Sequence, residues 1–335
     1  MSLGDLWFVL IAVLWTGYFV LEGFDLGVGM LHRWVGRTEI DRRVAINSIG
    51  PVWDGNEVWL IVAGAGTFAA FPSWYATWFS AAYLALLLLL IALIARGVSF
   101  EWRSKVPVAA WRGVWSWTLT VGSALIPVLV GVALGDLLVG LPIDANEEYT
   151  GGFFDLLTPY GVWLGVTLLV LCLLHGAAFL GLKTDGDVRR RSRAVAVAVS
   201  WPAAVMVLVF SVWTHGISEA GALADVVLAV PVIAVIAAAL LARAGFEGRA
   251  FAATAVGIGA VIAALFANLY PNVMVSSTDA AYNLTVDGTA SGDYALKVMT
   301  IVTVVMLPIV LIYQGWSYYV FRARVRAPSQ LPPVL

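Results

Sequence analysis

The sequence predicts an all-α integral membrane protein with nine transmembrane helices, its N-terminus outside and its C-terminus in the cytoplasm. Three observations support this fold class: few charges, recurring long apolar stretches, and basic residues confined to alternate connections. Charged residues make up 12% of the 335 residues, hydrophobic residues 61%, and the mean hydropathy is +0.91. Soluble domains carry about 25% charge, so a soluble class is excluded. The single cysteine, Cys172, excludes an internal disulfide framework.

Nine apolar stretches are long enough to cross a hydrocarbon core about 30 Å thick, which needs about 20 residues per helix. They cover residues 6–30, 50–70, 76–100, 114–139, 159–182, 194–213, 223–242, 250–267 and 296–321. We divide them into a first four-helix bundle (1–140), a second four-helix bundle (141–268), an outer loop (269–293), a ninth helix (294–321) and a cytoplasmic tail (322–335). The two halves resemble each other only faintly, so an internal duplication stays open.

The basic residues indicate the orientation of the chain. Of the 19 Lys and Arg residues, 18 lie on alternate connections, and only Lys297 lies on the other side. The opposite connections include FPSW and a long polar stretch before the ninth helix. Cytoplasmic loops of membrane proteins carry the excess of Lys and Arg. We therefore place the basic connections and the C-terminus in the cytoplasm.

Two acidic pairs lie within apolar stretches where ionisable residues are rare. Glu22 and Asp25 are in LEGFDLGVG, and Asp54 and Glu57 are in GPVWDGNEVWL. Residues three apart share a face of a helix, and a charge at bilayer depth costs about 2.5–3.5 kcal/mol even on the lenient scale. A place near the membrane surface or a structural ion pair explains any single carboxylate equally well. Two such pairs on consecutive helices favour proton or cation handling.

Arg96, at the end of the third stretch, is the other unusual charge. It either extends its cation to the membrane surface or pairs with Asp25 or Glu22, which holds the carboxylate ionised.

Asp54 and Glu57 are expected deeper, two to four turns from the basic side. Pro51 and Gly55 loosen the helix there and leave backbone groups free for water. This predicts an access path for protons from the cytoplasm.

The sequence contains no nucleotide-binding glycine loop, nucleophile elbow or Cys/His cluster. The three histidines, His32, His175 and His215, are far apart and show no metal-ligand spacing, so paired haem ligation is not expected. We interpret His175 as a hydrogen-bonded packing residue. No catalytic residue, metal site or nucleic-acid partner is therefore expected in this chain.

Several long strings resemble subunit II of the cytochrome bd-type quinol oxidases. They are GFDLGVGML (23–31), GPVWDGNEVWL (50–60), FPSWYA (71–76), ARGVSFEWR (95–103) and, more weakly, LHGAAFLGLKTDG (174–186). The match is densest over about the first 105 residues. Over the rest of the chain, the expected count of nine helices supports the resemblance more weakly.

The resemblance implies a haem-free subunit of a heterodimeric respiratory oxidase in a prokaryotic cytoplasmic membrane. The partner, subunit I, would carry two haems b, one haem d and the quinol-oxidising loop. The complex would oxidise quinol, reduce O₂ to water and take protons from the cytoplasm. Some members bind a structural quinone in subunit II, and small accessory subunits occur; neither can be placed here.

The resemblance also assigns site residues. The family's proton route passes through the aspartate of WDGNE, here Asp54, and Asp25 and Arg96 are motif positions too. We therefore expect a proton pathway of Asp54, Glu57, Asp25 and Glu22, with two structural or charge partners, Arg96 and Trp53.

Two other functions stay open. A proton-coupled secondary transporter would show an inverted repeat with broken helices in both halves, but the second half has no counterpart of WDGNE. A purely structural scaffold for a catalytic subunit is the other alternative.

Overall fold

The structure is a computed structural model that describes residues 2–218 and 220–327. Its helices are α1 (Leu3–Val35), α2 (Glu39–Ile49), α3 (Trp53–Ala70), α4 (Pro72–Ala81), α5 (Tyr83–Trp102), α6 (Ala109–Val139), α7 (Pro159–Lys183), α8 (Gly186–Ile217), α9 (Ala222–Ala244), α10 (Glu247–Leu269), α11 (Val286–Thr289) and α12 (Asp293–Val320). Two short strands, β1 (Asn272–Met274) and β2 (Leu284–Thr285), pair antiparallel, and 3₁₀ turns cover Phe153–Leu156 and Ala280–Tyr282.

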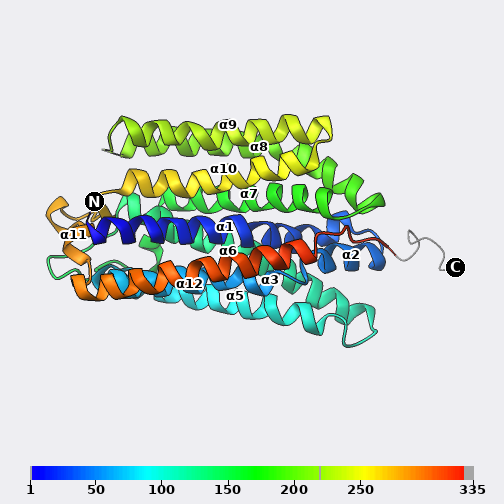
Figure 1. Cartoon of the computed structure of the whole chain (residues 1–335), viewed down its shortest axis with the longest axis horizontal. Coiled ribbons are helices and arrows are strands. Elements are labelled where there is room, and N and C mark those ends of the chain that lie inside the picture. The colour runs from blue at the N-terminus through cyan, green and yellow to red at the C-terminus, as the bar shows by residue number, and fades with distance from the viewer. Residues whose placement is uncertain (1, 219, 328–335) are drawn as a thin grey trace.

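The long helices run along one axis and form a single elongated bundle (Figure 1). Helices α8 and α9 lie along one edge, α12 and α5 lie along the opposite edge, and α1, α6 and α7 run between them. The N-terminus and α11 are at one end of the bundle, and the chain leaves α12 at the other. Helix α1 connects the two predicted four-helix bundles. It packs against α3 and α6 of the first half and against α7 and α10 of the second.

Eight helices in the described ranges are long and apolar enough to cross a membrane: α1, α5, α6, α7, α8, α9, α10 and α12. The second predicted stretch, residues 50–70, is not among these eight and corresponds to α3, an 18-residue helix with three polar side chains among its first five residues. Nine spans therefore stay a prediction, whereas the all-helical membrane-protein class is confirmed by the eight apolar helices.

The helices around the third predicted stretch, residues 76–100, begin and end at other residues than the sequence predicts. FPSW is not a loop, because only Phe71 separates α3 from α4, and Pro72 begins α4. Proline suits this first helical position because its missing N–H would have no partner there. Ala82 separates α4 from α5, so the expected span 76–100 is helical in two pieces.

Pairs of glycines allow three helices to pack with their backbones in contact. A Cβ atom at Gly27 of α1 would lie 2.0 Å from the carbonyl oxygen of Cys172 on α7, and one at Gly176 would lie 2.5 Å from Gly27 Cα. Helices α6 and α7 cross in the same way, at Gly131 with Gly165 and at Gly135 with Gly161. Small residues are what permit such close approach between membrane helices. The α1–α7 contact fixes the helix that carries Glu22 and Asp25.

Helix α12 has few buried residues and is held at three levels. Near its start, the Trp7 indole N–H lies 3.0 Å from the hydroxyl of Thr300. In its second half, Gln314 and Tyr318 bond to α3, as described below. Beyond its end, the Val325 N–H donates to the Lys183 carbonyl at 2.8 Å. The first part of the predicted tail is thus bound to the end of α7, whereas residues 328–335 lie outside the described residues.

Candidate functional site

Three acidic side chains and one arginine meet in the interior of the bundle. Glu22 and Asp25 lie one turn apart on α1, Glu57 lies in the second turn of α3, and Arg96 lies on α5. Glu22, Asp25 and Arg96 are fully buried, and the Glu57 side chain is 22% exposed. We call these four residues the carboxylate cluster.

The Arg96 guanidinium joins two of the acids. Its Nη2 atom lies 2.7 Å from Glu22 Oε1, and its Nη1 atom lies 2.8 Å from Glu57 Oε2. The guanidinium carbon lies 5.2 Å from the centroid of the Phe100 ring and 5.8 Å from that of Trp53, and the two rings stack on each other. Arg96 therefore forms a buried ion-pair bridge under an aromatic cover, with no extension to the surface. Of its two candidate partners on α1, Glu22 forms the ion pair.

Asp25 is held instead by Asn56, whose amide connects three helices. The Asn56 Nδ2 group donates to Asp25 Oδ2 at 2.6 Å and to the Leu21 carbonyl of α1 at 3.2 Å. Its Oδ1 atom accepts from Tyr318 at 2.8 Å and from Gln314 at 3.2 Å, both on α12. A primary amide offers two donors and one acceptor oxygen with two lone pairs, so Asn56 is fully satisfied and its orientation is fixed by these partners.

The cluster contains more negative than positive groups. Glu22, Asp25 and Glu57 together have one cationic partner, Arg96, within ion-pair distance in the described residues. An unpaired charge in a low-dielectric interior is costly, and such groups bind a proton instead. If all three acids were ionised, the cluster would carry a net charge of −2. The arrangement therefore favours proton binding within the cluster.

Asp54 is placed differently from the other three acids. Residues 39–49 form the separate helix α2, and the chain turns at residues 50–52 before α3 begins. Asp54 consequently lies in the first turn of α3, not two to four turns inside a continuous helix, and this expectation was wrong. It is exposed and forms no hydrogen bond or ion pair within the described part of the chain. Asp54 is thus available to solvent or to a partner protein, one turn before Glu57.

His175 has the packing role that its isolation in the sequence suggests. Its Nε2 group donates to the Val20 carbonyl at 3.1 Å, and Nδ1 lies 2.7 Å from the hydroxyl of Thr254. The ring stacks on Phe251 at 4.6 Å between centroids. Both ring nitrogens therefore have partners in the protein. No group of three or more His, Cys, Asp or Glu side chains within residues 2–218 and 220–327 is arranged to hold a metal ion.

The sequence interpretation missed Asn56 and its two partners on α12. Asn56 stands between Asp54 and Glu57 in WDGNE, and an amide buried in an apolar environment is costly unless it is hydrogen-bonded. That argument could have identified Asn56 as part of the site. Gln314 and Tyr318 could not be assigned from local pattern, because their contact with Asn56 joins residues more than 250 positions apart.

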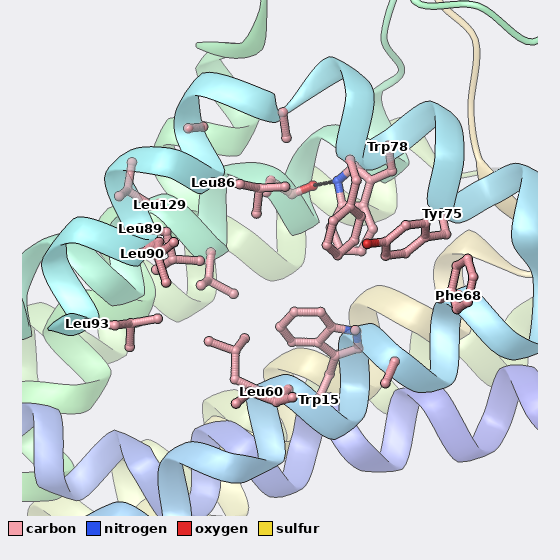
Figure 2. Close-up of a pocket in the computed structure, with 18 residues that line it drawn as sticks. Trp15, Leu60, Phe68, Tyr75, Trp78, Leu86, Leu89, Leu90, Leu93 and Leu129 are labelled. Atoms are coloured by element: carbon pink, nitrogen blue, oxygen red, sulfur yellow. Dashed lines mark hydrogen bonds between the residues drawn. The ribbon is translucent and has the colours of Figure 1, made fainter. Parts of the chain in front are cut away.

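An apolar cavity of about 460 Å³ lies between α1, α3, α4, α5 and α6. Figure 2 shows Trp15 and Trp78 close together on its lining, with leucines of α5 to one side and Phe68 and Tyr75 to the other, and the two indole rings meet edge to face at 5.9 Å between centroids. The Trp78 indole N–H donates to the Ala133 carbonyl at 3.2 Å. Residues exposed on the surface, among them Phe68 and Leu90, also line the cavity, so it opens to the side of the bundle.

Comparison with known proteins agrees with these features. The sequence model of the family described as cytochrome bd terminal oxidase subunit II matches residues 3–321. Cytochrome bd ubiquinol oxidase subunit 2 of Bacillus subtilis (strain 168) is 44% identical over 328 residues, covering 97% of each chain. Cytochrome bd-I ubiquinol oxidase subunit 2 of Escherichia coli (strain K12) is 36% identical over 357 residues, covering 96% of this chain and 94% of the relative.

The fold is also found in a solved structure. A chain in the structure of bd oxidase from Geobacillus thermodenitrificans superposes with a TM-score of 0.74, covering 96% of this chain and 99% of that chain at 15% sequence identity. That identity is low enough that the likeness supports the fold alone. The family match and the relatives confirm the resemblance carried by the WDGNE and GFDLG strings. The chain belongs to the family of cytochrome bd terminal oxidase subunit II.

Proposed function

We propose that this chain is the haem-free subunit of a cytochrome bd-type quinol:O₂ oxidoreductase in a prokaryotic cytoplasmic membrane. It stabilises the haem-bearing subunit I and conducts cytoplasmic protons toward the site of O₂ reduction. Family membership and the names of the relatives support the assignment to the oxidase. The buried carboxylate cluster is the observation that carries the proton role.

The charge of the cluster supports proton conduction over a purely structural role. A structural ion pair needs one carboxylate for one arginine, and Glu22 with Arg96 would satisfy that need. Glu57 and Asp25 are additional acids, and Glu57 keeps a partly exposed side chain. Groups that bind and release protons within a protein are found where burial and neighbouring charges perturb their ionisation. The two additional acids are therefore suited to accept protons and pass them on.

The proposed route begins at Asp54, at the exposed start of α3. Glu57 follows one turn later and contacts Arg96, which in turn contacts Glu22 of α1. Asp25 lies one turn from Glu22 on the same helix. This order joins a solvent-accessible acid to buried acids through groups that are in contact or one helical turn apart. Its direction, from the cytoplasm inward, depends on the orientation predicted from the basic residues.

The redox chemistry belongs to the partner subunit in this proposal. Two haems b and one haem d would be held by subunit I, and quinol and O₂ would be substrates of the assembled complex. A structural quinone, as in some members, would fit the 460 Å³ cavity, whose lining is apolar apart from the Tyr75 hydroxyl and indole N–H groups. Small accessory subunits and the lipid bilayer would cover other apolar surfaces.

A scaffold without proton conduction is the competing function, because the Arg96 bridge also ties α1, α3 and α5 together. A proton-coupled transporter has less support, since the family match places the chain with oxidase subunits.

Replacing Asp54 distinguishes conduction from scaffolding. Asp54→Asn keeps the side-chain volume but cannot exchange a proton. We expect the complex to assemble with normal haem content and to consume O₂ more slowly with a reduced quinol, and Asp54→Glu to retain more activity. Glu101→Gln, at an exposed position near the end of α5, is the matched control. A wild-type rate per haem for Asp54→Asn would leave Asp54 with a structural role only.

A further inference from the structure

An arginine and two exposed tryptophans meet at the basic end of the bundle, where α1 ends and α6 begins. The Arg33 guanidinium carbon lies 4.3 Å from the centroid of the Trp117 ring, and Trp34 meets the same ring edge to face at 6.3 Å between centroids. Trp34 is 58% exposed and Trp117 is 51% exposed. Tryptophan is enriched at the level of the lipid headgroups. We call these three residues the Arg–Trp site.

The Arg33 side chain is free to bind an anion. Trp117 covers one face of the planar guanidinium, and the N–H groups point outward in its plane. In the described part of the chain, none of these N–H groups has a hydrogen-bond or ion-pair partner. Arg42 and Arg103 also lie close enough to repel the charge of Arg33. A phosphate group accepts paired hydrogen bonds from such a guanidinium and would offset this repulsion.

The acids nearest in the sequence do not neutralise this site, because other arginines already bind them. Glu39 of α2 forms an ion pair with Arg103 at 2.8 Å, and Asp41, the other acid of α2, pairs with Arg191 of α8 at 3.0 Å. Within residues 2–218 and 220–327, four arginines around the turn from α1 to α2 consequently have no acidic partner: Arg33, Arg37, Arg42 and Arg43. The site therefore has an excess of positive charge.

The basic residues that follow α7 are in a different state. Arg189 pairs with Glu247 at 2.7 Å, and Arg190 pairs with Asp187 at 2.9 Å. An external anion at these arginines would have to compete with a carboxylate of the same chain. The turn from α1 to α2 has no such competitor among the described residues, so an anion from outside the chain is favoured there.

An exposed apolar stripe on α6 passes through the Arg–Trp site and continues along the bundle. It consists of Val114, Trp117, Val121 and Leu125, each at least 44% exposed. Their spacing of three and four residues places them on one face of the helix, over about three turns. The stripe thus joins a group that can bind phosphate to a surface that an acyl chain can cover.

We propose that the Arg–Trp site binds an anionic phospholipid from the leaflet at the basic end of the bundle. Arg33 binds the phosphate, Trp34 and Trp117 contact the headgroup region, and one acyl chain lies along the α6 stripe. Charge complementarity selects this occupant, because a zwitterionic headgroup brings no net negative charge to the four arginines. A free phosphate ion would leave the stripe uncovered. The inference does not depend on the proton role proposed above.

The test measures how much lipid the purified complex binds. The complex is delipidated in detergent and mixed with phosphatidylglycerol or phosphatidylcholine, and bound lipid is counted by native mass spectrometry. We expect Arg33→Gln to bind phosphatidylglycerol on the order of fivefold more weakly than the wild type, the effect of removing one basic contact. Trp117→Leu should weaken binding as well, and added salt should weaken it in the wild type. Arg190→Gln removes the same charge from an exposed, ion-paired position and should match the wild type.

Three results would overturn the proposal. Arg33→Gln could bind phosphatidylglycerol as the wild type does, or phosphatidylcholine could bind as tightly as phosphatidylglycerol. Inorganic phosphate at the same concentration could raise the unfolding temperature of the delipidated complex as much as phosphatidylglycerol does, which would assign the site to a free anion. Lipids on the partner subunit contribute equally to every variant, so only the differences between variants count. Should Trp117→Leu not assemble, Arg33→Gln decides, because the Arg33 side chain has no hydrogen bond to lose within the described residues.

Discussion

Replacing Arg96 with leucine should destabilise the assembled complex by about 3–5 kcal/mol, the usual effect of removing one partner from a buried ion pair. The guanidinium is fully buried and contacts Glu22 at 2.7 Å and Glu57 at 2.8 Å. Without it, three acids would share one site with no cation. Since native proteins are stable by only about 5–15 kcal/mol, this loss should lower the yield of assembled complex strongly.

The structure also predicts which second substitution restores stability. Glu22 is fully buried, whereas the Glu57 side chain is 22% exposed and can be hydrated when its cation is removed. Glu22→Gln should therefore rescue Arg96→Leu better than Glu57→Gln does. Asp25→Asn should rescue least, because Asp25 is bonded to Asn56 and forms no ion pair with Arg96. Double-mutant cycles isolate these pairwise contributions.

The assay is the amount of haem-containing complex per milligram of membrane protein, followed by thermal unfolding of the purified complex. Arg96→Leu should lower both the amount and the unfolding midpoint, and the order of rescue should be Glu22, Glu57, Asp25. A single Arg96→Leu variant with normal yield and an unchanged midpoint would refute the buried-bridge argument. Equal rescue by all three neutral substitutions would show that only the total charge matters.

The remaining predictions test other parts of the fold. Gly27→Ala should reduce assembly, because its methyl group would lie 2.0 Å from the α7 backbone. Gly113→Ala, whose methyl group would have no atom within 4 Å, should be tolerated. The yield of purified complex measures both effects. His175→Ala should leave all three haem signals in the absorption spectrum, since both ring nitrogens are engaged within this chain, but lower stability by about 1–3 kcal/mol. A reporter active only outside the cell should be active when fused near Asp287 and inactive at Arg190; activity at both positions would contradict the predicted orientation.

Sequence periodicity and composition predict the helices well because each long apolar stretch must form its own backbone hydrogen bonds in a membrane. Six of the nine expected stretches lie within single helices, and the stretches 50–70 and 296–321 extend α3 and α12 by three residues and one residue. Gly161 and Gly165 are spaced as small residues are at close contacts between membrane helices, and both lie at the α6–α7 crossing. These features depend on local sequence alone, so a single chain is enough to find them.

The helix break around Pro51 and the division at Ala82 were not predicted. Both lie inside stretches whose overall hydropathy suits one continuous helix, and hydropathy averages over the residues that interrupt it. The sequence predicts that Pro51 only loosens a continuous helix, whereas the chain ends α2 at Ile49 and starts α3 at Trp53. The consequence was an incorrect position for Asp54, because counting turns assumes an unbroken helix.

Among the candidate residues, spacing identified the acids but not their partners. Glu22 and Asp25 share a face of α1, yet they are held by different groups, Glu22 by Arg96 and Asp25 by Asn56. No pattern along one helix distinguishes these roles, since the choice depends on where α3 and α5 lie around α1. The pairing is a tertiary property, and the sequence alone left both possibilities for Arg96 open.

The cluster combines a firmly packed side with a loosely packed one, and this division suits the proton exchange proposed for it. Its acids on α1 are fixed by the backbone contact between Gly27 and α7. Asn56, which orients Asp25, receives two of its hydrogen bonds from α12, the least buried of the long apolar helices within this chain. Elements with few buried contacts open at lower free energy than the core does. A shift of α12 would therefore release the Asn56 amide and admit water to Asp25 without disturbing the Arg96 bridge, which involves only α1, α3 and α5.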